Sequence, residues 1–193
     1  MATIQIEVPE GKKAVWKNGV LTLVDEEKPK NVMERIKTID DAIKELGEDN
    51  ILVKQLDNFC KRDTDESVQD YGDILAYLQL RIICAALNEG WTPQFTKGEY
   101  RYYPWFELWT KKEIEELDEE ARARVVCRSS NVALSYGGVS YSYAYGDSSS
   151  TCASFGSRLV FRTSELARYA GEQFLDIWAD FVFKVGTPDD KKK

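Results

Sequence analysis

The chain has 193 residues, of which 43% are hydrophobic and 31% are charged, and its net charge is −7. This length suits a single domain, and this apolar content is enough for a core without disulfides or metal. The acidic charge disfavours binding to nucleic-acid phosphates, and no stretch approaches the roughly 20 apolar residues of a membrane-spanning helix.

Residue usage gives little support to catalysis or metal binding. Histidine is absent, which removes the commonest general base near neutral pH and the usual nucleophile pairs. The four cysteines include no closely spaced pair, so buried free thiols are expected rather than a zinc site; they are Cys60, Cys84, Cys127 and Cys152. We therefore expect no catalytic residue, no metal and no cofactor.

The N-terminus predicts a small antiparallel sheet. Residues 3–8 alternate apolar and polar side chains, and Asn18-Gly19 lies in the middle of a second extended segment, residues 14–24. Asn-Gly tolerates the positive φ angles of a type I′ turn, so this segment predicts a β-hairpin. We place this N-terminal unit at residues 1–30. The first residues lack the basic start and apolar run of a secretory signal, which indicates synthesis in the cytoplasm.

The centre of the chain predicts helices. Thr38 and Asp41 have the spacing of a capping box, and Gly47 suits a left-handed helix end. Two further helices are expected over residues 50–60 and 67–88. The second carries an apolar stripe wide enough to form one wall of a core.

The C-terminal half mixes extended and helical patterns. Residues 91–109 are rich in aromatic side chains, and Pro104 among them indicates an edge strand or a bulge. Thr110 opens a short charged helix with a second capping box. The further elements expected are strands at residues 125–128 and 156–161 and one long helix at residues 164–183.

Together these patterns predict an α+β protein. It has a small N-terminal antiparallel sheet, a helical centre and a C-terminal antiparallel sheet packed against two long helices. The main domain is expected at residues 31–186, and the tail at residues 187–193 is expected to be disordered.

Residues 129–154 stand out because only one of the 26, Asp147, is charged, while nine are serine and four are tyrosine. Tyrosine, serine and glycine are the residues that recognition loops favour. Within this passage "VSYSYAY" alternates, which predicts a strand with its tyrosines on one face. The alternative is that the tyrosines cover the core and the serines meet solvent. The predicted ligand-binding residues are Tyr136, Tyr141, Tyr143, Tyr145, Asn131, Asp147 and Trp105.

Two other features are interpreted as structural. The aromatic residues between Tyr100 and Trp109 could stack nucleic-acid bases, but few basic residues accompany them, so core packing is favoured. The acidic run after Thr110 is typical of a solvated helix face.

Two blocks of the sequence carry a resemblance to a known family. "AALNEGWTPQFTKGEYRYYPWFELW" and "GSRLVFRTSELARYAGEQFLDIWADFVF" resemble an uncharacterised protein family of phages and prophages of gut Bacteroides-type bacteria. This resemblance implies a bacterial host cytoplasm or a virion as the setting, but no chemistry. Residues 127–130 and 156–159 also resemble the frame around the variable segments of retroelement-diversified C-type-lectin-like proteins, although the helix expected after them departs from that pattern.

The sequence favours a non-enzymatic phage or prophage protein that binds a protein or glycan partner through a face rich in tyrosine and serine. Two alternatives stay open. The same face could be a subunit contact in a virion or another self-assembling structure. A pocket lined by tyrosine and tryptophan could instead hold a nucleotide in a protein that counters host defence.

Overall fold

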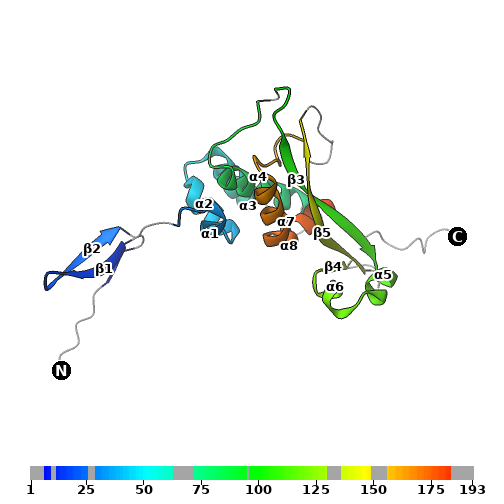
Figure 1. The fold of residues 1–193 in the computed structure, drawn as a ribbon, viewed down its shortest axis with the longest axis horizontal. Coiled ribbons are helices and arrows are strands. Elements are labelled where there is room, and N and C mark those ends of the chain that lie inside the picture. The colour runs from blue at the N-terminus through cyan, green and yellow to red at the C-terminus, as the bar shows by residue number, and fades with distance from the viewer. Residues whose placement is uncertain are drawn as a thin grey trace.

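The computed structural model describes residues 7–9, 12–25, 29–62, 72–94, 96–129, 136–148 and 156–183 (Figure 1). Within these residues the fold is α+β, as predicted. The helices are α1 (Val32–Arg35), α2 (Ile39–Leu46), α3 (Ile51–Arg62), α4 (Gly72–Leu87), α5 (Lys111–Glu116), α6 (Glu119–Ala123), α7 (Ser164–Gln173) and α8 (Leu175–Val182). The strands are β1 (Lys12–Lys17), β2 (Val20–Asp25), β3 (Arg101–Thr110), β4 (Val126–Ser129) and β5 (Tyr136–Asp147).

The N-terminal hairpin, β1 and β2, forms around the predicted turn. Asn18 and Gly19 have φ angles of 51° and 77°, which is the backbone that a type I′ turn requires. Figure 1 shows the hairpin lying apart from the other elements, and no side chain described in it is buried. Of the predicted strand at residues 3–8, residues 3–6 lie outside the described residues and residues 7 and 8 form no strand.

The predicted capping boxes explain where two helices begin. The Thr38 hydroxyl accepts a hydrogen bond from the Asp41 backbone N–H, and the Asp41 carboxylate accepts one from the Thr38 N–H at 2.9 Å. Thr110 and Glu113 make the same reciprocal pair at the start of α5. Each box satisfies backbone donors that a helix leaves without partners in its first turn.

The main sheet is antiparallel with the strand order β3-β5-β4. β3 lies at an edge, as Pro104 predicted, because a proline cannot donate to a neighbouring strand. β4 pairs with the first four residues of β5, up to Val139. Helices α7 and α8 pack on one face of the sheet, which we call the inner face, and α4 packs against α8 and α2 behind them.

The core lies between the inner face of the sheet and the helices. Trp178 of α8 is fully buried, its indole N–H donates to the Ala170 carbonyl at 3.1 Å, and its ring lies 5.3 Å from that of Phe106 on β3. The buried Asn88 at the end of α4 joins this core to the segment before α7, because its amide donates to the Val160 carbonyl at 2.8 Å and accepts from the Arg162 N–H at 3.0 Å.

The predicted strand at residues 156–161 is not formed. Residues 156–158 form a turn, and a single antiparallel bridge joins Phe161 to Tyr102 of β3. Leu159, Val160 and Phe161 are buried one after another, whereas a strand with one solvated face would alternate. The prediction of a strand at residues 156–161 is therefore wrong, and its apolar residues pack in the core instead.

The predicted single helix at residues 164–183 is two helices. α7 ends at Gln173, Phe174 has φ −113° and ψ 29°, and α8 begins at Leu175. Phe174 is buried, and its ring packs edge-on against Tyr169 at 6.3 Å. Neither proline nor glycine occupies position 174, so no helix-breaking residue explains the break. We attribute it to the packing of the buried Phe174 side chain.

Candidate functional site

The register between β3 and β5 shifts once, and this shift decides which tyrosines share a face. Trp105 lies opposite Tyr143, but the next residue, Phe106, lies opposite Tyr141. Ser142 is therefore an extra residue in β5, which makes a β-bulge. The extra residue turns Tyr141 to the inner face while Tyr143 stays on the opposite, outward face.

Tyr141 packs on the inner face against the helices. Its ring is half-buried and meets Phe106 edge-on at 6.4 Å, and a Cβ added to Gly171 of α7 would lie only 2.5 Å from it. The prediction that Tyr141 shares a face with Tyr143 and Tyr145 is therefore wrong. Serine and tyrosine alternate along the sequence, but the extra residue at Ser142 places Tyr141 on the opposite face of the sheet from Tyr143.

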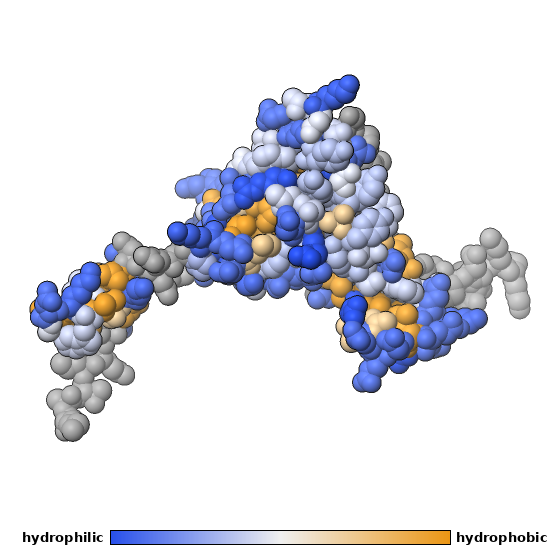
Figure 2. Space-filling model, viewed as in Figure 1, coloured by the Kyte–Doolittle hydropathy of each residue, from blue (hydrophilic) through white to orange (hydrophobic). Residues whose placement is uncertain are grey.

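A connected group of aromatic rings lies on the outward face, and we call it the outward aromatic surface. It consists of the exposed Trp105, Tyr143 and Tyr145, with the buried Tyr103 beside Tyr145. The Trp105 and Tyr143 rings are stacked with centroids 6.0 Å apart, Tyr145 lies 6.3 Å from Trp105, and Tyr103 lies 5.5 Å from Tyr145. Trp105, Tyr143 and Tyr145 are 43%, 47% and 43% exposed. In Figure 2 the visible surface over β3 and β5 is mostly pale, neither strongly hydrophilic nor strongly hydrophobic.

Polar side chains lie along the same face. The Trp109 indole N–H donates to the Ser140 hydroxyl at 2.8 Å, and the Ser142 hydroxyl donates to the Glu107 carboxylate at 3.3 Å. The serines therefore share the outward face with Tyr143 and Tyr145. The alternative in which tyrosines cover the core and serines meet solvent holds only for Tyr141.

A buried arginine lies at the end of the sheet beyond Tyr145. Arg101 at the start of β3 is only 3% exposed and donates to the Ser148 carbonyl at 2.8 Å. Asp147, one of the predicted ligand-binding residues, lies directly opposite Arg101 in the strand register. Asp147 therefore belongs to the end of the sheet, beyond Tyr145 on the same strand.

The remaining predicted residues have separate outcomes. Trp105 contacts both Tyr143 and Tyr145 and so lies at the centre of the surface. The backbone of Tyr136 opens β5 opposite Ser129, but its side chain lies outside the described part of the chain. Asn131 also lies outside it. The structure thus brings together Trp105, Tyr143 and Tyr145 from the predicted set.

Sequence reasoning included Trp105 but missed the other residues that β3 contributes. Tyr103, Glu107 and Trp109 lie on the outward face beside residues of β5. Residues at positions i and i+2 of a strand share a face, so odd-numbered residues around Trp105 could have been grouped with it. The pairing partner of each required the register, which the sequence does not specify.

Comparisons of the chain with known protein families, with curated proteins and with solved structures give no match. Within the described residues, no group of three or more cysteine, aspartate or glutamate side chains is arranged to hold a metal ion, and no helix is long and apolar enough to span a bilayer.

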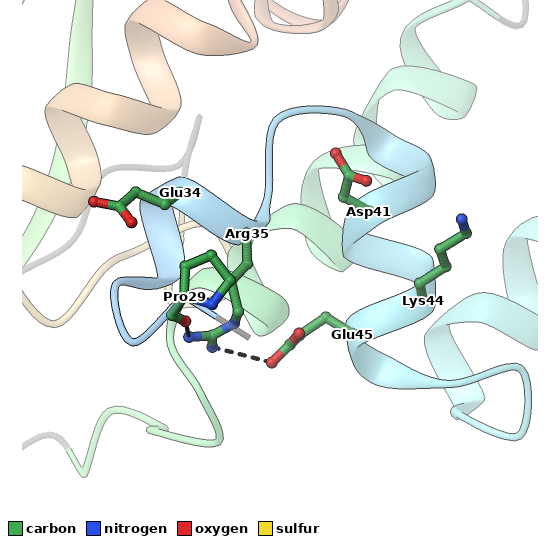
Figure 3. A pocket seen from close by; sticks show the side chains of 6 residues that line it. All are labelled: Pro29, Glu34, Arg35, Asp41, Lys44 and Glu45. Carbon is green, nitrogen blue, oxygen red and sulfur yellow. Dashed lines mark hydrogen bonds and ion pairs between the residues drawn. The ribbon is translucent and has the colours of Figure 1, made fainter. Parts of the chain in front are cut away.

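A hollow with charged walls lies near the N-terminal end of the main domain (Figure 3). Arg35 lies in it and donates to Glu45 at 3.0 Å and to Glu89 at 2.8 Å, and it also donates to the Pro29 and Lys30 carbonyls. The hydrogen bond from Arg35, followed by one from Arg162, lowers the pKa of Glu89. Through Arg35 of α1 these bonds join the segment before α1 to α2 and to the turn that follows α4, so we interpret this hollow as a structural clasp.

The cysteines only partly match the prediction of buried thiols. Cys84 in α4 is buried, and burial raises the pKa of its thiol. Cys60 and Cys127 are exposed, contrary to the prediction, and Cys152 lies outside the described residues.

Proposed function

We propose that this chain is a non-enzymatic binding protein that holds a protein or glycan partner on the outward aromatic surface. One observation carries the proposal. Trp105, Tyr143 and Tyr145 form a continuous group of rings, with Trp105 stacked on Tyr143 and tilted against Tyr145, on the face of the sheet that α7 and α8 do not cover.

The exposed rings of the outward aromatic surface are suited to binding because they are both accessible and held in place. Three large rings exposed side by side leave apolar area in water that a partner could cover. The rings already hold one another in place, so little side-chain entropy would be lost on binding. Ser142 and Glu107 beside them supply hydrogen-bonding groups for a hydroxyl-bearing or amide-bearing partner.

Binding is favoured over catalysis because of the groups that are missing from the sequence and from this face. The chain contains no histidine. The Glu107 carboxylate lies beside the rings, where it accepts a hydrogen bond from the Ser142 hydroxyl. A planar aromatic group suits recognition better than proton transfer. The phage or prophage setting implied by the "YPWF" and "GSRL" blocks belongs to this proposal as well.

A second candidate function is a structural component of a virion or another assembly. The observation that favours it is the hairpin of β1 and β2, which lies apart from the main domain with Trp16 71% exposed. The hairpin is a different part of the molecule from the outward aromatic surface.

The test of the proposed function removes rings from the outward aromatic surface. We expect Trp105→Ala and the pair Tyr143→Ser, Tyr145→Ser each to weaken binding to hits from a glycan array and a host-protein array by at least about tenfold, as residues central to an interface do. Affinities would be measured by isothermal titration calorimetry, with the melting temperature of each variant measured alongside.

Tyr100→Ser is the matched control, because Tyr100 is 55% exposed but stacks on Tyr102 instead of on the outward aromatic surface. It should leave the affinity unchanged. Loss of binding by Tyr100→Ser to the same extent, or unfolding of the Tyr143 and Tyr145 variant, would contradict the proposal.

A further inference from the structure

The hairpin of β1 and β2 is an element without a packing partner in the described chain. Its main contacts are those between its own two strands, and an isolated two-stranded hairpin is marginally stable in water. The strand register places Trp16, Leu21 and Leu23 on one face and Lys13 and Lys17 on the other. Figure 2 shows apolar residues at the surface of the hairpin, and the hairpin itself lies apart from the main domain.

The main sheet has a matching unpaired edge. β4 covers the outer edge of β5 only as far as Val139, and no described residue pairs with that edge from Ser140 to Gly146. Backbone N–H and C=O groups that point outward from such an edge can accept another strand. Beside this edge lies a groove of about 440 Å³. Its lining residues are Tyr141, Ser142, Tyr143, Ala144, Ser164, Glu165, Arg168 and Glu172.

The groove is acidic on its helix side. α7 contributes Glu165 and Glu172 with Arg168 between them, so the helix side carries a net charge of −1. Burial raises the pKa of Tyr141, and the charge of Glu172 adds to this rise while Arg168 opposes it. A strand added here would have one face toward α7 and the other continuous with the outward aromatic surface.

The hairpin fits this groove in charge and in spacing. β1 and β2 contain three lysines and one aspartate, a net charge of +2, in a chain whose net charge is −7. Lys13 and Lys17 share a face about 13 Å apart along a strand, and Glu165 and Glu172 lie about 10 Å apart along a helix. Lysines on an edge strand oppose pairing with another positively charged edge by repulsion. They do not oppose pairing with an edge that has acidic residues beside it.

We propose that the hairpin of one copy of this chain adds to the free edge of β5 in a second copy, with Lys13 and Lys17 facing Glu165 and Glu172. The contact is head-to-tail, because hairpin and groove are different surfaces, so successive copies form rings or chains of subunits. Trp16 on the other face of the hairpin then extends the outward aromatic surface of the neighbour. This inference does not depend on whether that surface binds a further partner.

The experiment measures the mass of the full chain by sedimentation equilibrium between about 10 μM and about 1 mM, the range expected for a small interface. The weight-average mass should rise above the 22.1 kDa of one chain. Lys13→Glu with Lys17→Glu should raise the dissociation constant at least about tenfold, as should Glu165→Lys with Glu172→Lys. An equimolar mixture of these two variants should associate again, because each supplies the partner that the other lacks.

The controls carry the same charge changes on α5. Lys111→Glu with Lys112→Glu, and Glu115→Lys with Glu116→Lys, alter exposed side chains of one helix and should leave the dissociation constant within about twofold, as expected for charges outside an interface. The proposal is overturned if the mass stays at that of one chain up to about 1 mM, if the controls weaken association as much, or if the mixture stays dissociated.

Discussion

Gly171 shows how a single residue sets the distance between α7 and the sheet. It is buried, and a Cβ at this position would lie 2.5 Å from the Tyr141 ring and 2.8 Å from the Pro104 Cβ. We expect Gly171→Ala to lower the free energy of unfolding by about 1–2 kcal/mol, because the strain of overpacking exceeds the gain in helix propensity. Urea unfolding followed by circular dichroism measures this change.

Gly72→Ala is the control for helix propensity. Gly72 is the exposed first residue of α4, and a Cβ there would have no atom within 4 Å. This variant should be neutral or more stable by up to about 1 kcal/mol. A stabilising effect at Gly171 as well would mean that α7 lies farther from Tyr141 than the structure shows.

At the scale of elements, the sequence predicted what local chemistry decides. The Asn18-Gly19 turn and the capping boxes at Thr38 and Thr110 each satisfy their backbone within a few residues, and the structure confirms all three. The break at Phe174 and the bulge at Ser142 depend on what packs against them from elsewhere in the chain. Such tertiary effects leave no signal in a local pattern.

The candidate site likewise has a part that the local sequence predicted and a part that depends on tertiary structure. Composition and alternation pointed to the correct strand, and Tyr143 and Tyr145 are exposed on it. The position of Tyr141 could not be predicted, because one extra residue exchanges the two faces of a strand. The contribution of Tyr103 required knowledge of the neighbouring strand.

The position of the bulge in β5 can be tested by deleting single residues of that strand. Deleting Ser142 removes the extra residue, so each remaining side chain of β5 should keep its face, and the loss should be about 1 kcal/mol from the hydrogen bond to Glu107. Deleting Ser140 should cost at least about 2 kcal/mol more, because it forces the fully buried Val139 outward or moves Tyr141 to solvent.

Both deletions remove a serine from the same strand, so composition is matched. The stability of each is measured by chemical denaturation, and near-ultraviolet circular dichroism reports whether the aromatic rings keep their packing. Equal losses for the two deletions would show that the register shift lies elsewhere in β5.

At the scale of the whole molecule, the main domain should fold without the hairpin. No side chain described in β1 or β2 is buried, and the clasp around Arg35 begins only at Pro29. Removing residues 1–28 should therefore leave the melting temperature within about 2 °C at about 5 μM protein, where association through the hairpin is negligible. Differential scanning calorimetry makes this measurement.

Val32→Ala, just after the hairpin and its connection, gives the contrast. Val32 is buried in the core at the start of α1, so its truncation should cost about 2 kcal/mol and lower the melting temperature by several degrees. A comparable fall on removal of residues 1–28 would mean that the hairpin packs on the main domain of its own chain. Its lysines would then pair with acidic residues of the same chain instead of those of a second copy.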